Sequence, residues 1–249
     1  MPDASMLLIL ATFLLAGLIK GVIGLGLPTV SLAILTLALD LPSAMALLLV
    51  PSFVTNLWQA LAGGHSRLIL GRSWPFLLMA TVSIWFGAQT LKYVPLSTLS
   101  ALLGSLLVAY AGASLGGLRC TISAPQAKWA GPLLGLVNGV LTGMTGSFVV
   151  PGVIYLQALG FTRDALIQAM GMLFALSTLA LALALQSNDL LTIEHGTRST
   201  IALLPAIAGM VLGQRIRRLI AESLFRKLFF LFLLMLGAYI IVTALGDFA

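Results

Sequence analysis

Long apolar runs recur along the whole chain and are separated by short polar stretches. Four of the clearest cover residues 43–62, 73–91, 96–118 and 225–245. Each is close to the ~20 residues that a helix needs to cross the hydrocarbon core of a bilayer. Charged residues make up only 8% of the 249 residues, whereas soluble domains have roughly 25%. The pattern predicts an all-α integral membrane protein that crosses the membrane several times.

The few polar residues argue against several other classes of protein. The net charge is +6, but the basic residues lie between apolar runs, where they orient a chain in the membrane rather than bind nucleic acid. The single cysteine, Cys120, can form neither an internal disulfide nor a metal cluster. No positive charge precedes the apolar residues 6–19, so we expect this segment to be retained rather than removed as a signal peptide. We predict no cofactor, no metal and no catalytic residue.

A glycine-rich motif that ends in proline occurs twice. Residues 17–28 read GLIKGVIGLGLP, and residues 135–151 read GLVNGVLTGMTGSFVVP. Three longer apolar spans follow each motif, the second set at residues 164–186, 199–216 and 225–245. We therefore predict two homologous four-segment repeats, residues 1–118 and 129–249, joined by a polar loop at residues 119–128.

The distribution of basic residues distinguishes two topologies for these repeats. If each glycine-rich segment crosses the membrane once, the repeats are parallel and the basic residues divide almost evenly between the two sides. If each segment is re-entrant, the repeats are inverted. Of the basic residues in the loops, only Lys92 and Arg198 then lie outside, whereas Lys20 lies within an apolar segment. Because cytoplasmic loops are enriched in Lys and Arg, inverted repeats with both termini outside are predicted.

Both glycine-rich motifs are expected to break a helix within the membrane. Unpaired backbone groups are costly there, so such breaks persist only beside protein or a water-filled cavity. Pro28 and Pro151 suit the first turn of a new half-helix, whose N-terminus attracts anions. Gly24 and Gly26 would form the first break. The side chains that could add donors for a small anion are Thr29, Ser31, Asn138, Thr142, Thr145 and Ser147.

Further polar side chains lie on the spans that follow the breaks. Ser52, Asn56 and Gln59 share one helical face, as do Gln168 and Thr178. Such stripes suit the lining of a transport path, although hydrogen bonding between helices accounts for them equally well. In the same way, the glycines of both motifs suit either a site or close helix packing.

Lys20 is the one charged residue deep inside an apolar segment. An ionisable residue at such a depth is by default a candidate for function, here the attraction of an anion to the first break. The alternative is that its long side chain reaches back to the membrane surface. No Asp or Glu lies in the middle of a span, so the usual carboxylate for proton or sodium coupling is missing.

These features resemble the TauE/SafE family of sulfite exporters, which are bacterial permeases for sulfite, organosulfonates and related anions. The resemblance rests on the paired breaks that end in Pro28 and Pro151, and on the stretches LDLPSA at residues 39–44 and LGFTRDA at residues 159–165. It implies a multi-pass transporter of the bacterial inner membrane that exports a small sulfur oxyanion. Family members often have three consecutive glycines before the proline, whereas this chain has Gly-Leu-Gly-Leu at residues 24–27.

Two other functions compete with the permease. A membrane enzyme needs an acid–base pair or a metal cluster, and the sequence offers neither. A scaffold or assembly subunit without a substrate would use the broken segments for packing alone. The expected partners are a small anionic substrate and the lipid bilayer, with a second copy of the chain left open and no nucleic acid.

Overall fold

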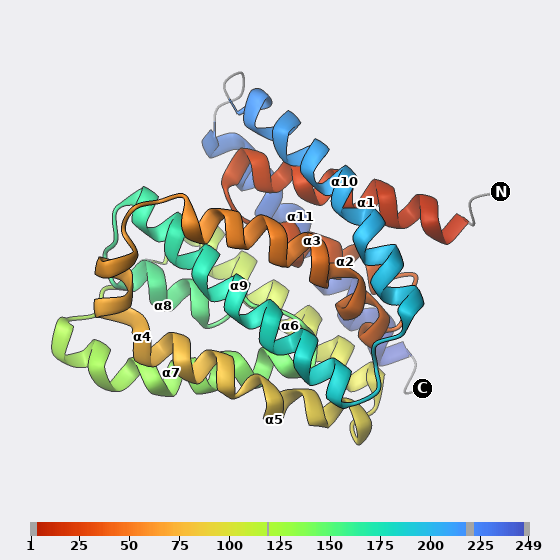
Figure 1. The fold of residues 1–249 in the computed structure, drawn as a ribbon, viewed down its shortest axis with the longest axis horizontal. Coiled ribbons are helices and arrows are strands. Elements are labelled where there is room, and N and C mark those ends of the chain that lie inside the picture. Colours follow the sequence, from red (N-terminus) through yellow and green to blue (C-terminus); the bar gives the residue numbers. More distant parts are fainter. Residues whose placement is uncertain (1–3, 119, 218–221, 247–249) are drawn as a thin grey trace. The chain divides into compact units, whose positions relative to one another are not determined.

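The computed structural model describes residues 4–118, 120–217 and 222–246. Within these ranges every regular element is a helix (Figure 1). In chain order, the helices are α1 (Ala4–Ile23), α2 (Leu27–Leu35), α3 (Leu41–Leu61), α4 (Ser66–Val82), α5 (Ile84–Gln89), a 3₁₀ turn (Thr90–Lys92), α6 (Leu96–Leu115), α7 (Ala124–Thr145), α8 (Gly152–Ala158), α9 (Arg163–Ser187), α10 (Ile193–Ile216) and α11 (Glu222–Gly246). Seven stretches of the described chain are long and apolar enough to span a membrane. The prediction of an all-α, multi-pass membrane protein is confirmed.

Some helices extend beyond the apolar runs at their polar ends. α4 begins at Ser66 rather than at residue 73, so Arg67 and Arg72 lie within the helix. α7 begins at Ala124 with a capping box, so only part of the stretch at residues 119–128 is irregular, and residue 119 lies outside the described residues. Hydropathy detects the part of a helix in hydrocarbon, whereas backbone hydrogen bonds continue into the polar first turns.

The described chain forms two compact units that each take helices from both halves of the sequence. Unit 1 comprises Met1–Pro51, Val94–Gly117 and Leu190–Ala249, and unit 2 comprises Ser52–Tyr93 and Leu118–Asp189. The chain goes from one unit to the other at four points, and three of these lie in turns or loops. The fourth falls within α3, at Pro51.

In unit 1, α1 packs along α10 through glycines on both helices. A Cβ atom on Gly17 or Gly21 would collide with backbone carbonyl oxygens of α10. Reciprocally, a Cβ on Gly209 or Gly213 would collide with carbonyl oxygens of α1. Close packing therefore explains Gly17 and Gly21, as expected for small residues spaced four apart in membrane helices. The helices α6 and α11 form a second contact within this unit.

Unit 2 contains a matching contact, in which α7 packs on α4 and α5. A Cβ on Gly139 would collide with the hydroxyl of Ser83, and one on Gly143 with the carbonyl of Ile84. In both units the first helix of one predicted half thus packs on the second of the three longer spans of the other half. The duplication itself stays a prediction.

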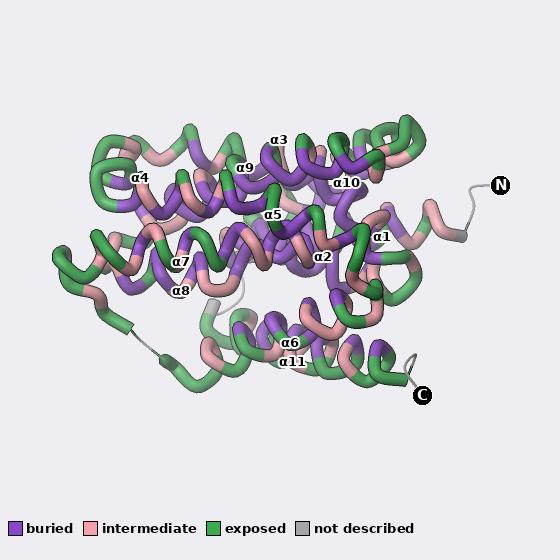
Figure 2. Tube along the Cα trace, turned by 90° about the horizontal axis from the view of Figure 1, so that it is seen from below, coloured by how far each residue is buried: buried purple, intermediate pink, exposed green. Residues whose placement is uncertain are grey.

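The short helix α2 belongs to the core of unit 1. All of its residues except Ile34 are buried (Figure 2). It packs against α1 and α11. A helix too short to span the membrane needs protein on its sides and ends, because lipid cannot satisfy its terminal backbone groups.

Candidate functional site

The first predicted break separates α1 from α2. The chain leaves α1 after Ile23, and Gly24 and Gly26 adopt left-handed conformations with φ of 88° and 112°. Residues with a side chain are strained in this region, so the two glycines allow the sharp change of direction. The helix α2 then begins at Leu27, with Pro28 in its first turn. A short helix therefore follows the first break, and its function as a half-helix that binds an anion stays a prediction.

Three predicted site residues surround this break, and all are buried. Lys20 lies in the last turn of α1 and is only 4% exposed, which favours an internal role over a side chain that reaches the membrane surface. Thr29 is also buried in the first turn of α2. The hydroxyl of Ser31 donates to the carbonyl oxygen of Leu27 at 2.8 Å, so it is engaged within its own helix.

The second break lies between α7 and α8. Gly146 ends α7 in a left-handed conformation with φ of 73°. The hydroxyl of Thr142 donates to the carbonyl oxygen of Ser147 at 2.9 Å, and the amide of Ser147 donates to the hydroxyl oxygen of Thr145 at 3.2 Å. The two threonines therefore hold the irregular segment in place. The helix α8 begins at Gly152.

Asn138 connects α7 to the start of α8. Its Oδ1 accepts a hydrogen bond of 2.9 Å from the amide of Gly152. Because that oxygen is occupied by an N–H donor, the other end of the side chain is the NH₂ group, which can only donate. Asn138 is fully buried, and its Nδ2 has no partner. The position predicted to bind an anion thus both caps α8 and presents a free donor.

Ser147 supplies a second hydrogen-bond group without a partner, a hydroxyl, in the same break. Its side chain is 2% exposed and its Oγ has no hydrogen-bond partner. Its carbonyl oxygen accepts a hydrogen bond from the hydroxyl of Thr142. Thr142 lies one helical turn after Asn138, on the same face of α7. Both groups belong to unit 2, whereas the first break belongs to unit 1. A cavity shared by the two breaks stays a prediction.

The polar stripes of α3 and α9 meet within unit 2. The hydroxyls of Ser52 and Thr178 lie 3.2 Å apart, and the Nδ2 of Asn56 donates to Ser52 at 3.0 Å. Further along, the Nε2 of Gln59 donates to the carbonyl oxygen of Ile167 at 2.6 Å. The stripes therefore hydrogen-bond across the two helices, as the alternative interpretation of the sequence required.

Gln168 makes the densest set of contacts in this group. Its Nε2 donates to the carbonyl oxygen of Ala60 at 2.7 Å and to the hydroxyl of Ser66 at 3.0 Å. Its Oε1 accepts from the amide of His65 at 2.8 Å. The side chain thus fastens α9 to the turn between α3 and α4.

The comparison with protein families decides the class of protein. The family model described as sulfite exporter TauE/SafE matches residues 9–240, which is nearly the whole chain. The chain belongs to the TauE/SafE family. Members of the TauE/SafE family are membrane transporters of the sulfite exporter type and not enzymes, so these two predictions are confirmed. No individual curated protein and no solved structure matches the chain significantly.

Two residues that this TauE/SafE chain uses for backbone hydrogen bonding were not predicted from its sequence. The amide of Gly152 donates a hydrogen bond to Asn138 Oδ1. The sequence feature that could have indicated this role is a glycine directly after Pro151. Ser199 bonds to the backbone of α3 beside Pro51. The sequence feature that could have indicated this role is Pro51 within a long apolar span. A proline inside a helix leaves one carbonyl oxygen without its usual N–H donor, so another group must supply the hydrogen bond.

Proposed function

We propose that the chain is a secondary permease for a small oxyanion, such as sulfite or a short organosulfonate, in the bacterial inner membrane. The family match supports transport of this general type. We further propose that the anion is held at the N-termini of the two half-helices α2 and α8, and that net movement is export.

The observation that carries this proposal is the pair of unused hydrogen-bond groups at the second break. Asn138 Nδ2 and Ser147 Oγ are buried and have no partner. A buried donor left unsatisfied costs about 1–3 kcal/mol, so binding of a hydrogen-bond acceptor to these groups is favourable. An oxyanion offers several acceptor oxygens, and hydrogen bonds to charged groups are stronger than neutral ones. A small oxyanion therefore suits this break better than a cation or an apolar solute.

The other predicted site residues have different parts in this proposal. Lys20 supplies the basic side chain of the first break, together with Thr29 and the start of α2. Thr142 and Thr145 shape the second break through their backbone hydrogen bonds. The remaining predicted site residues hold α3 against α9 beside the proposed transport path. They are Asn56, Gln59, Gln168 and Thr178.

The direction of transport follows from the charge of the substrate. A monovalent anion that leaves a cell with a negative interior gains about 2.3 kcal/mol per 100 mV of membrane potential. Export on this gradient requires no coupling carboxylate. The sequence accordingly places no Asp or Glu in the middle of a span.

Reconstitution tests the proposal directly. Purified protein in liposomes, loaded with labelled sulfite or a short sulfonate, is expected to release the anion faster than protein-free liposomes. A potential that is negative inside should accelerate release, and the opposite potential should slow it. A panel of sulfite, sulfonates, sulfate and chloride defines the selectivity. If no anion in the panel moves faster than through protein-free liposomes, the scaffold interpretation becomes the better one.

A further inference from the structure

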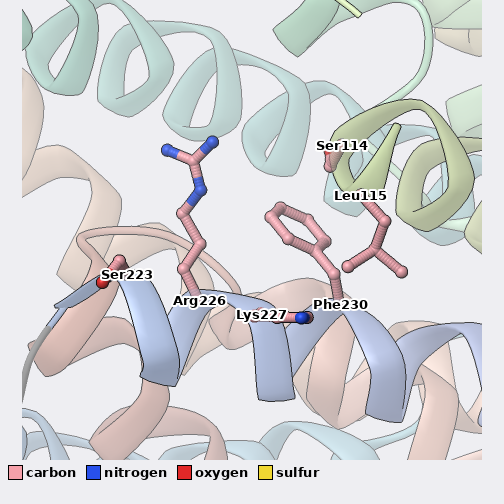
Figure 3. A pocket seen from close by; sticks show the side chains of 6 residues that line it. All are labelled: Ser114, Leu115, Ser223, Arg226, Lys227 and Phe230. Carbon is pink, nitrogen blue, oxygen red and sulfur yellow. The ribbon is translucent and has the colours of Figure 1, made fainter. Parts of the chain in front are cut away.

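A pocket of about 570 Å³ opens between the end of α6 and the start of α11, both within unit 1 (Figure 3). It lies outside the two breaks and plays no part in the proposed transport site. Two basic side chains and two hydroxyls line it beside apolar groups, and none of the lining residues that the structure describes is acidic. These residues are Ser114, Leu115, Ser223, Arg226, Lys227 and Phe230.

An aromatic cluster fixes one wall of the pocket. The guanidinium of Arg226 lies 6.0 Å from the centre of the Phe230 ring, close enough for a cation–π contact. Phe230 is 4% exposed and packs edge-on against the ring of Tyr110 of α6, with centres 5.3 Å apart. Through the Phe230 ring, the Arg226 guanidinium is therefore in contact with the packing between α6 and α11. Arg226 and Lys227 are themselves exposed.

An exposed apolar stripe begins beside Lys227 and continues along α11. Its large side chains recur every three or four residues, so they share one face of the helix. Each is at least 45% exposed, and the members are Leu224, Leu228, Leu231, Met235, Tyr239 and Val242. Because α11 is long and apolar enough to span a membrane, this exposed face is suited to contact with the acyl chains of lipids. From Leu231 to Val242 the stripe is roughly 16 Å long at helical rise.

We propose that this pocket binds the phosphate head group of an anionic phospholipid, whose acyl chains lie along the stripe of α11. Arg226 and Lys227 donate charge-assisted hydrogen bonds to the phosphate oxygens. The hydroxyls of Ser114 and Ser223 are placed to bond the remaining head-group oxygens. Basic pockets between membrane helices favour anionic over zwitterionic lipids, because no choline or ethanolamine charge opposes the protein. The apolar stripe favours a lipid over a soluble phosphate.

Lipid titration of the intact protein in detergent tests the proposal. Phosphatidylglycerol, phosphatidylcholine and inorganic phosphate are added separately, and binding is measured by native mass spectrometry and by the melting temperature. Phosphatidylglycerol is expected to bind more tightly and to raise the melting temperature more than either comparison. Equal binding of phosphatidylcholine would overturn the preference for anionic lipid. Equal protection by inorganic phosphate would replace the lipid site by a site for soluble anions.

Variants assign the binding to the pocket. Arg226→Gln and Lys227→Gln should each weaken phosphatidylglycerol binding about fivefold, and together about thirtyfold, because each basic residue near an anionic surface contributes about this much. Arg67→Gln removes the same charge from an exposed position of α4 and serves as the control. An equal loss in the control would overturn the assignment. If the double variant does not fold, the two single variants and the comparison of lipids on the unaltered protein still test whether the pocket binds phosphatidylglycerol.

Discussion

The hydroxyl of Ser199 in α10 donates a hydrogen bond to the carbonyl oxygen of Leu47 in α3, over a distance of 2.8 Å. In a regular helix this carbonyl would accept from the amide four residues later, but that residue is Pro51, which has no N–H group. The amide of Val50 in turn donates to the Ser199 oxygen at 3.1 Å. Ser199 therefore replaces the hydrogen bond that the proline removes from a buried part of the span.

Replacing Ser199 by alanine is expected to destabilise the protein by about 1–3 kcal/mol, because the Leu47 carbonyl is left without a partner. The melting temperature of the purified protein measures the effect. Thr200→Ala is the matched control, since the Thr200 hydroxyl is exposed and bonds only to the Gly196 carbonyl of its own helix. We expect that control to change the melting temperature little.

Pro51→Ala tests the reason for this effect. Alanine restores an N–H that can reach the Leu47 carbonyl, so the loss of Ser199 should cost less in the Pro51→Ala background. A double-mutant cycle measures the difference. An equal cost in both backgrounds would show that Ser199 acts through some other contact.

Asn138→Asp separates the two roles of the Asn138 side chain. Aspartate keeps an oxygen for the Gly152 amide but replaces the free NH₂ donor by a second oxygen. We therefore expect α8 to remain capped while anion transport falls at least tenfold, since hydrogen bonds to charged groups contribute about 1.5–3 kcal/mol. Sulfite flux in liposomes and the melting temperature are measured together. A fall in flux that merely follows a fall in folded protein would contradict a binding role.

Ser177→Ala provides the control for this experiment. Ser177 is also fully buried in unit 2 with a hydroxyl that has no partner, but it lies on α9 rather than at the break. Its loss should leave the flux unchanged. If it lowers the flux as much as the change at Asn138, unused buried hydroxyl and amide groups do not mark the site.

Gly152→Ala is expected to disturb the second break by crowding. The added Cβ would lie 2.5 Å from Asn138 Oδ1 and 2.9 Å from Leu173 Cδ2, so the cap must move. Overpacking of this kind typically costs about 1–3 kcal/mol. Gly71→Ala in α4 is the comparison, because no atom lies within 4 Å of its added Cβ and alanine favours a helix. A melting temperature lowered equally by both changes would contradict the role of Gly152.

The sequence predicted the features that depend on local chemistry. Apolar length identified the spans, and glycine followed by proline located both breaks, because these residues limit the backbone whatever surrounds them. The helix starts at Ser66 and Ala124 were missed because polar first turns carry no hydropathy signal. Local patterns thus gave the class of fold and the places where helices stop.

The contacts of the polar side chains were beyond prediction from one sequence. Spacing put Ser52, Asn56 and Gln59 on one face of α3, but only the structure pairs them with α9. Asn138 was identified as a donor, whereas its bond to Gly152 depends on the approach of α8 to α7. In each case the residue's surroundings come from a segment distant in the sequence.

The last prediction concerns Lys20, the buried basic residue of the first break. If it contacts the anion, Lys20→Gln should raise the KM for sulfite about tenfold or more, because a charge-assisted hydrogen bond contributes about 1.5–3 kcal/mol. Lys20→Arg should retain part of the affinity, since it keeps a positive donor. Lys92→Gln removes an exposed charge and should leave the KM unchanged. A Lys20→Gln protein with lowered stability but an unaltered KM would assign Lys20 to packing and place the anion at the second break alone.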